Sequence, residues 1–260
     1  MQLHFFKYQG TGNDFIILDN RTNEYNLTKD QISFLCNRRF GVGADGLMLL
    51  NTHPHYDFEM KYYNADGGES SMCGNGGRCL VKFAADRGMV RQDYRFIAID
   101  GEHEASIEID GTVALKMNDV RSMQHDRGRF ILDTGSPHYV NMVDNVMALD
   151  VVGKGREVRY NSMFKENGIN VNFVQQTVDP DKIIVRTYER GVEDETFSCG
   201  TGVTAAALVC YHNETGFNHV EVKTKGGDLR VEFDKMEDNF TNIWLIGPAL
   251  KVFEGTIEIK

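Results

Sequence analysis

The feature of this chain that most restricts its fold is a short segment that occurs twice. The first copy reads CGNGGRC at residues 73–79, and the second reads CGTGVTA at residues 199–205. Each copy places a cysteine directly before a Gly-x-Gly turn, and each turn opens a stretch that is predicted to be helical. In both halves the segment follows a strand that ends in Tyr and a polar residue, and then a loop rich in Gly and acidic residues. A duplicated domain accounts for this repeated order.

We therefore predict an α+β fold of two similar domains related by pseudo-two-fold symmetry. Each domain is expected to have a curved, mostly antiparallel, barrel-like sheet around a central helix. Residues 1–120 would form the first domain, which carries Cys73 and is joined by a C-terminal strand at about 249–260. Residues 121–248 would form the second domain, which carries Cys199.

Aromatic and β-branched runs predict the strands, and capping residues and glycine stops predict the helices. Helices are expected at residues 29–39, 75–87 and 201–213, with a weaker one at 150–159 because Gly153 and Gly155 interrupt it. The predicted strands are residues 3–9, 14–19, 57–64, 95–100, 105–109, 113–118, 129–134, 170–176, 182–188, 219–224, 228–233, 241–246 and 249–259.

Composition narrows the class of protein. A formal net charge of -10 over 260 residues, with no basic cluster, argues against a nucleic-acid binder. No apolar run approaches the ~20 residues that span a bilayer, and residues 1–10 do not resemble a secretory signal. Five irregularly spaced cysteines form a poor disulfide framework, and the lack of a CxxC pair argues against structural zinc. We expect a cytoplasmic enzyme with no metal, and no partner among nucleic acids or membranes.

The placement of Cys73 and Cys199 at predicted helix starts indicates chemistry. The positive end of the helix dipole favours a thiolate there. One such thiol suggests a nucleophile, whereas two in matched halves suggest an acid and a base on opposite sides of one substrate. Buried cysteines are also common core residues. We assign that ordinary role to Cys36, Cys79 and Cys210, which lie inside helical patterns among apolar neighbours.

The Gly-x-Gly turns admit two interpretations. Glycine can serve only to turn the chain. Alternatively, the bare backbone amides at the two helix starts bind an anion, which a carboxylate or a phosphate could supply. The complete phosphate-loop motif is absent from the sequence, so a carboxylate is favoured.

Several motifs together resemble the diaminopimelate epimerase family. They are GTGNDF at 10–15, GVGADG at 41–46, NADG at 64–67 with CGNG at 73–76, and ERG at 189–191 with CGTG at 199–202. The resemblance runs from Lys7 to about Gly247. It implies the interconversion of LL- and meso-diaminopimelate at one α-carbon without pyridoxal phosphate, another cofactor or a metal. That reaction serves lysine and peptidoglycan precursor biosynthesis.

The resemblance also implies roles for individual residues. Cys73 and Cys199 would be the two acid–base groups, and His138 would support them. The substrate-binding positions would be Asn13, Asn64, Gly74, Asn75, Asn170, Glu189, Arg190, Gly200 and Thr201. Ordinary alternatives are a solvated ion pair for Glu189 and Arg190, a loop cap for Asn64 and a structural buried histidine for His138.

The chain departs from the family pattern at three places. Ser136 stands where some members carry Asn, which removes an amide from the expected site. Gly46 stands where some members carry Gln. The loop at residues 191–196 is one residue longer and more acidic than the common form.

Three other functions remain open on the sequence. A proline or hydroxyproline epimerase would use the same two thiols but leave Asn64, Glu189 and Arg190 with little to do. A thiol redox switch would use Cys73 and Cys199 as a disulfide. A non-catalytic anion-binding module would keep its ligand when both cysteines are replaced. The sequence does not decide between a monomer and a homodimer.

Overall fold

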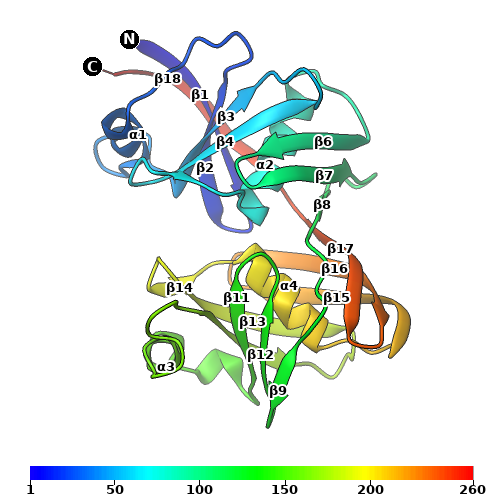
Figure 1. The fold of residues 1–260 in the computed structure, drawn as a ribbon. Helices are drawn as coiled ribbons and strands as arrows, with labels where there is room; N and C mark the ends of the chain where they lie inside the picture. The colour runs from blue at the N-terminus through cyan, green and yellow to red at the C-terminus, as the bar shows by residue number, and fades with distance from the viewer. Residues whose placement is uncertain (260) are drawn as a thin grey trace. The chain divides into compact units, whose positions relative to one another are not determined.

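The chain forms two units, each with its own strands and helices (Figure 1). The computed structural model describes residues 1–259. Unit 1 comprises Met1–Leu115 and Pro248–Lys260, and unit 2 comprises Lys116–Gly247. The sequence places the boundary between the two predicted domains at residue 120, and the division into domains 1–120 and 121–248 stays a prediction.

Unit 1 contains two helices, and the last strand of the chain completes its sheet. Its elements are β1 (Gln2–Gly10), β2 (Asn13–Asp19), α1 (Lys29–Cys36), β3 (Gly46–Asn51), β4 (Phe58–Asn64), β5 (Glu69–Ser70), α2 (Gly74–Asp86), β6 (Asp93–Ala98), β7 (Gly101–Ile107), β8 (Val113–Lys116) and β18 (Leu250–Glu258).

Unit 2 contains two α-helices and one short 3-10 helix. Its elements are β9 (Gln124–Asp126), β10 (Arg129–Asp133), β11 (Pro137–Met142), η1 (Val146–Ala148), α3 (Val151–Arg159), β12 (Asn170–Gln176), β13 (Lys182–Glu189), β14 (Asp194–Thr196), α4 (Gly200–Val209), β15 (Thr215–Thr224), β16 (Gly227–Met236) and β17 (Asn239–Gly247).

The two units repeat one order of strand pairing. In unit 1, β2 pairs with β3 in parallel across α1, and β4 pairs with β6 in parallel across α2. In unit 2, β11 pairs with β12 in parallel across α3, and β13 pairs with β15 in parallel across α4. The other pairings within each unit are antiparallel. The predicted fold class, two similar strand-rich α+β halves, is confirmed.

A central helix fills the concave side of each sheet. Helix α2 contacts β1, β2, β3, β7 and β18, and α4 contacts β10, β11, β12, β13, β15, β16 and β17. Ten of the thirteen residues of α2 are buried, as are eight of the ten in α4. Small side chains allow this close approach: a Cβ on Gly77 would lie 3.1 Å from the Met72 sulfur. Each helix therefore begins within the sheet that surrounds it, which holds its N-terminus in place.

The outer helices cover smaller apolar clusters. Helix α1 packs Ile32 and Leu35 on a core that includes Leu3, Ile16 and Ile259. Its N-terminus has a capping box, in which Thr28 and Gln31 satisfy each other's backbone amides. Helix α3 covers the corresponding cluster in unit 2. The core of unit 1 thus uses residues from both ends of the chain.

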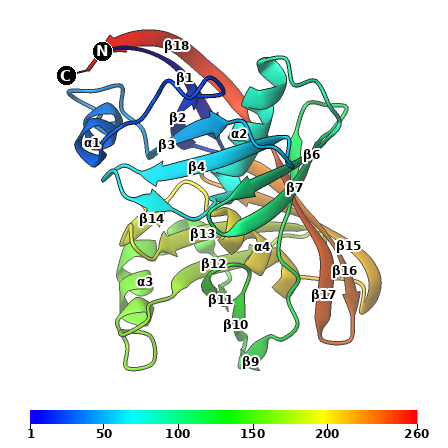
Figure 2. The ribbon, with the colours of Figure 1, turned by 45° about the horizontal axis from the view of Figure 1, so that its top comes forward.

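The C-terminal strand β18 lies beside β1, as both ribbon views show (Figures 1 and 2). The pairing is antiparallel and runs from Gln2 opposite Glu258 to Gln9 opposite Leu250. The two ends of the chain therefore lie close together in unit 1.

Six elements were not predicted, namely β3, β11 and the short elements β5, β9, β14 and η1, whereas the weaker helix predicted at residues 150–159 is confirmed as α3. Strand β3 was not predicted, because its apolar residues are buried on both faces and show no alternation. Strand β11 was not predicted either, because it starts at Pro137, a residue that strands tolerate only at special positions. Helix α3 continues through Gly153 and Gly155. A Cβ at Gly155 would lie 2.4 Å from the Cβ of Tyr188, so glycine lets the helix pack on β13.

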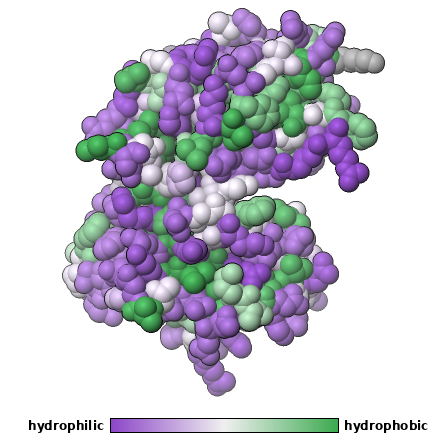
Figure 3. Space-filling model, turned by 180° about the vertical axis from the view of Figure 1, so that it is seen from behind, coloured by the Kyte–Doolittle hydropathy of each residue, from purple (hydrophilic) through white to green (hydrophobic). Residues whose placement is uncertain are grey.

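Hydrophilic residues cover most of the face seen in Figure 3, with smaller hydrophobic patches among them. Within residues 1–259, none of the helices has the length and apolarity needed to cross a membrane.

Candidate active site

Cys73 occupies the N-cap of α2. Its backbone is extended, with φ -98° and ψ 130°, and its carbonyl accepts the first helical hydrogen bond from Gly77 at 2.7 Å. Gly74 and Asn75 follow as buried residues of the first turn. The amides of a first turn have no intrahelical partner, so they can bind an anion. The half-buried thiol therefore lies where the helix terminus favours negative charge.

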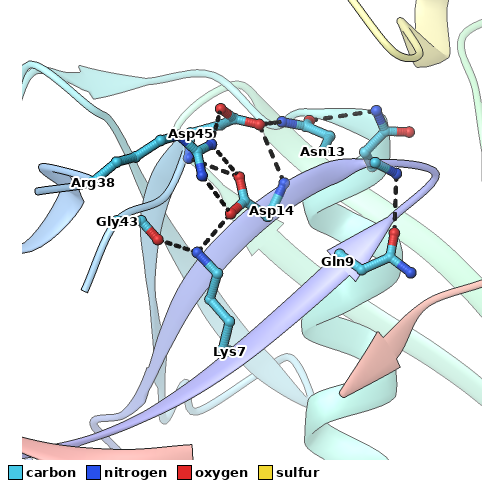
Figure 4. Close-up of polar contacts among 9 residues, drawn as sticks. Lys7, Gln9, Asn13, Asp14, Arg38, Gly43 and Asp45 are labelled. Carbon is cyan, nitrogen blue, oxygen red and sulfur yellow. Dashed lines mark hydrogen bonds and ion pairs between the residues drawn. The ribbon is translucent and has the colours of Figure 1, made fainter. Parts of the chain in front are cut away.

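Asn13 connects this thiol to the carboxylate of Asp45, and Figure 4 shows the contact between Asn13 and Asp45. Its Oδ1 accepts from the Cys73 sulfur at 3.6 Å and from Asn75 Nδ2 at 3.3 Å. Its Nδ2 donates to Asp45 Oδ2 at 2.7 Å. An ionised carboxylate can only accept, so Asp45 fixes which end of the Asn13 amide faces Cys73. The sequence-predicted residues Asn13, Cys73 and Asn75 are thus brought together in unit 1.

Two cations hold the carboxylates behind Asn13 (Figure 4). Arg38 bonds Asp14 at 2.6 Å and Asp45 at 2.7 Å, and Lys7 bonds Asp14 at 2.7 Å. Burial alone would raise the pKa of Asp14, but the hydrogen bonds from Arg38 and Lys7 outweigh it and hold that pKa at about 2. Sequence reasoning assigned none of these four residues a role, although all lie in or beside the quoted motifs.

Arg78 is fully buried one turn into α2. It donates to the Gly74 carbonyl at 3.2 Å and to Asn75 Oδ1 at 3.0 Å. Burial lowers its pKa, and negative charge on Cys79 or Cys73 would raise it. Burial also raises the pKa of Cys79 to about 12, so that neighbour is a neutral thiol at physiological pH. The guanidinium therefore favours the thiolate of Cys73.

Cys199 has the same backbone setting in unit 2. It is the N-cap of α4, it is buried, and its carbonyl accepts from Val203 at 2.8 Å. Gly200 and Thr201 supply the first-turn amides. The Thr201 hydroxyl lies 3.5 Å from the Cys199 sulfur. Cys199 thus meets a hydroxyl, whereas Cys73 meets a carboxamide.

Ser136 lies at the centre of a polar cluster beside Thr201. Its Oγ is 3.3 Å from the Thr201 hydroxyl, 3.0 Å from His138 Nε2 and 3.0 Å from Asn170 Nδ2. The sequence analysis named Ser136 only as a departure from the family pattern. The structure shows that its hydroxyl bonds the predicted site residues His138, Asn170 and Thr201.

His138 is buried and held on both ring nitrogens. Nδ1 is 3.0 Å from Asn172 Nδ2, and Nε2 faces Ser136. Burial, and to a lesser extent the charge of Arg190, lowers its pKa to about 3. The ring is therefore neutral at physiological pH. Asn172, which the sequence analysis did not single out, sets its orientation.

Asn170 and Arg190 are joined through the backbone. Asn170 Oδ1 accepts from the Arg190 amide at 2.9 Å, and the Arg190 guanidinium donates to the Asn167 carbonyl at 3.0 Å. Glu189 precedes Arg190 as the last residue of β13 and is half-buried. These three predicted residues thus lie at the ends of the neighbouring strands β12 and β13.

The longer acidic loop after Arg190 is anchored within unit 2. Glu193 accepts from the hydroxyls of Tyr188 at 2.9 Å and Tyr160 at 3.0 Å, and it pairs with Arg159 at 3.3 Å. Glu195 pairs with Arg186 at 2.6 Å. The additional acidic groups are therefore engaged by cations and hydroxyls of the same unit.

Two further positions belong to unit 1. Asn64 ends β4, and its backbone closes the following turn with Gly67 and Gly68 at 2.9 Å. At Gly46, a Cβ would lie 2.5 Å from the Tyr62 ring, so this chain has no room for the larger residue of other members.

No cluster of three or more His, Cys, Asp and Glu side chains suited to a metal ion occurs in residues 1–259. The side chains with a described contact to the two cysteine sulfurs are instead a carboxamide, Asn13 at Cys73, and a hydroxyl, Thr201 at Cys199.

Comparison with known families agrees with these motifs. A family model described as diaminopimelate epimerase matches residues 5–123 and 130–252. The chain belongs to the diaminopimelate epimerase family. A diaminopimelate epimerase of Flavobacterium psychrophilum is 47% identical over 98% of this chain and 100% of the relative. One from Chlorobaculum tepidum is 45% identical over 96% of this chain and 99% of the relative.

Solved structures show how widely this fold is used outside the diaminopimelate epimerase family. A PhzF-family phenazine biosynthesis protein from Bacillus anthracis aligns with a TM-score of 0.74 at 15% identity, over 100% of both chains. A hydroxyproline epimerase from Agrobacterium vitis aligns with a TM-score of 0.65 at 14% identity, over 98% of this chain and 92% of that one. At such identities the likeness concerns the fold alone.

Proposed function

We propose that this protein epimerises LL-diaminopimelate to meso-diaminopimelate. It is a member of the diaminopimelate epimerase family and therefore an isomerase. The observation that supports the reaction best is the repeated helix start, which puts one cysteine of each unit at the N-cap of a buried helix. The substrate is a small molecule, and the reaction belongs to lysine and peptidoglycan precursor biosynthesis in the cytoplasm.

Inversion at an α-carbon requires a base on one face and an acid on the other. We assign these roles to Cys73 and Cys199, one as thiolate and one as thiol, exchanging with the direction of reaction. Because the two thiols act as a pair, their ionisation is a property of the pair. In this proposal the two thiols carry out both proton transfers, and no cofactor takes part.

The first-turn amides would bind the carboxylate next to the reacting carbon. Those amides belong to Gly74, Asn75, Gly200 and Thr201. When the α-carbon loses its proton, negative charge spreads onto this carboxylate, and fixed N–H donors stabilise it without rearrangement. The support is that all four residues lie in the first turns of α2 and α4.

The distal amino-acid end of the substrate would be held by polar side chains. Arg190 suits its carboxylate, since a guanidinium forms two parallel hydrogen bonds to it, and Glu189 suits its ammonium. Asn13, Asn64 and Asn170 would complete the binding. His138 is neutral, so it supports the site by holding other groups in place.

The test is incubation of the reduced enzyme with LL-diaminopimelate in D2O, followed by NMR and chiral chromatography. The proposal predicts meso product with deuterium at one α-carbon. A folded, fully reduced sample that gives neither deuterium nor meso product would exclude this substrate.

Two alternatives are tested in the same experiment. Inversion of proline or hydroxyproline instead of diaminopimelate would favour the related epimerase, which shares this fold. Reversible oxidation of the two cysteines, with no exchange on any amino acid, would favour a redox switch. The mass of the enzyme in solution would decide between a monomer and a homodimer.

A further inference from the structure

In the polar cluster around Ser136 in unit 2, the donor and the acceptor of each hydrogen bond can be derived. The derivation starts from backbone groups that can only donate or only accept. Asn172 Nδ2 lies 3.3 Å from the Tyr139 carbonyl, which can only accept, and Asn172 Oδ1 accepts from Thr187 at 2.9 Å. The amide nitrogen therefore faces His138, and it donates to Nδ1. Since the ring is neutral, its single proton is on Nε2, which donates to Ser136.

Ser136 receives a second donor from Asn170. The orientation of that amide is also fixed, because its Oδ1 accepts from the Arg190 backbone N–H. Asn170 Nδ2 then donates to Ser136 Oγ at 3.0 Å. A hydroxyl has two lone pairs and one proton. With both lone pairs used, the Ser136 proton is directed to Thr201 Oγ1, 3.3 Å away.

Thr201 connects Ser136 to the sulfur of Cys199. Its hydroxyl accepts from Ser136, so its own proton is available to Cys199 Sγ at 3.5 Å. Hydrogen bonds donated to a charged acceptor stabilise the charged form. In unit 1 the neutral group facing Cys73 is instead an acceptor, the Oδ1 of Asn13.

We infer that Ser136 and Thr201 form a one-way hydroxyl relay from His138 to Cys199, which stabilises the Cys199 thiolate. Both hydroxyls are positioning groups, because they act through the sulfur. The inference rests on the proposed function only in taking Cys199 as one of the acid–base pair. It also gives Ser136 a role, which is to donate its hydroxyl proton to Thr201. An asparagine at this position would have to donate from its side-chain amide instead.

Charged groups of unit 2 lie on the strands and loops beside the relay. Arg190 acts on His138. Before α4, Glu195 is paired with Arg186 and Lys225. The position that corresponds to Arg78 in the repeated segment is Thr204, whose hydroxyl donates to the Gly200 carbonyl at 3.0 Å. The relay thus supplies a hydroxyl donor to Cys199, whereas the corresponding helix start in unit 1 carries the buried cation Arg78.

The experiment measures the iodoacetamide alkylation rate of each cysteine by peptide mass spectrometry, without substrate and across a pH series. Cys73 in the same molecule is the internal reference. In Thr201→Val, Cys199 should react roughly tenfold more slowly at neutral pH, and its rate should rise at a higher pH than in the wild type. Ser136→Ala should slow it less, by roughly threefold, because Thr201 keeps a hydroxyl that is no longer held in place.

Two matched variants separate the relay from packing. Thr201→Ser keeps the hydroxyl and should restore the wild-type rate at Cys199. Thr204→Val removes a buried hydroxyl from the same helix and should leave the Cys199 rate unchanged. An unchanged Cys199 rate in Thr201→Val, or a Thr201→Ser variant as slow as Thr201→Val, would overturn the inference.

The relay and the proposed function can fail separately. Slower Cys199 alkylation in Thr201→Val, together with no inversion of diaminopimelate by the wild type, would leave the relay standing and remove the function. If the wild type inverts diaminopimelate normally and Thr201→Val has no effect on Cys199 alkylation, the function would stand and the relay would be removed.

Discussion

The two cysteines share a backbone setting but have different neighbours. Each is an extended N-cap residue followed by glycine. Around Cys73 the protein places a carboxamide held by Asp45 and a buried guanidinium, whereas around Cys199 it places hydroxyls. LL- and meso-diaminopimelate are diastereomers and not mirror images. Two proton-transfer groups with unlike surroundings suit such a substrate.

Arg78 should control the ionisation of Cys73 through its charge. In Arg78→Met the buried cation is lost, so Cys73 should be alkylated roughly tenfold more slowly, with Cys199 as the reference. Arg78→Lys keeps the charge while it loses the paired hydrogen bonds to Gly74 and Asn75. It should retain most of the Cys73 rate, and an equal loss in both variants would show that charge is not the cause.

Asp14 should make unit 1 sensitive to acid. Its pKa of about 2 lies below the unfolded value of about 3.9, so its ion pairs stabilise the fold above about pH 4. This stabilisation is lost as the pH falls toward 2. We expect about 1–2 kcal/mol at pH 7, reduced by the partial exposure of the pair to solvent.

The check is urea unfolding of the wild type and Asp14→Asn at a series of pH values. The variant should be less stable at pH 7, and the difference should shrink between pH 4 and pH 2. A difference that stays constant over that range would contradict the role of this carboxylate.

At the residue scale, the sequence named residues of the repeated motif and, through the family resemblance, Asn13, Asn170 and His138, but it did not give the hydrogen bonds that join them. Cys73, Asn75, Cys199 and Thr201 follow from the helix-start pattern. Asp45, Asn172 and Ser136 act from other strands and loops, and only the folded pairing brings them to the cysteines. Asp45 lies inside the motif at 41–46 and Ser136 was named as a departure from the family pattern, but neither sequence position indicates which side chains these residues bond.

At the element scale, the glycines of the two helix starts differ in what surrounds them. A Cβ at Gly202 would lie 2.4 Å from Asn172 Oδ1 and 3.3 Å from His138 Cε1. A Cβ at Gly76 would meet only flexible or distant atoms, with Met48 Sδ at 3.2 Å nearest. The start of α4 therefore has less room for change than the start of α2.

Gly202→Ala should therefore displace Asn172 and the buried histidine. We expect a loss of about 1–3 kcal/mol in the free energy of unfolding and at least a tenfold loss in kcat. Gly76→Ala should cost less on both measures, because a methionine side chain can move. Denaturant unfolding and steady-state kinetics of both variants check this, and equal effects would refute the difference in packing.

Strand prediction succeeded at β16, which alternates buried and partly exposed residues along most of its length. It also succeeded at β12, which has the predicted bounds although its first five residues are all buried. Strand β3 is buried throughout, so alternation could not show it. The sequence also did not predict which strands pair in parallel, because those pairings depend on which strand follows each helix crossover.

At the scale of the whole molecule, the repeated segment was the most informative part of the sequence. One topology used twice gives two buried helices, each starting at a cysteine. We assign one proton-transfer group to each unit. Neither unit alone would then supply both the base and the acid that inversion of an α-carbon requires.

The most direct test follows α-hydrogen exchange in D2O with Cys73→Ala and Cys199→Ala, each given LL- and meso-diaminopimelate. Both variants should unfold thermally as the wild type does and should fail to invert configuration. Each retained thiol should still exchange the α-hydrogen on its own face, so the two variants should label opposite configurations. Inversion by either variant, or labelling of the same configuration by both, would contradict the assignment of one acid–base thiol to each unit.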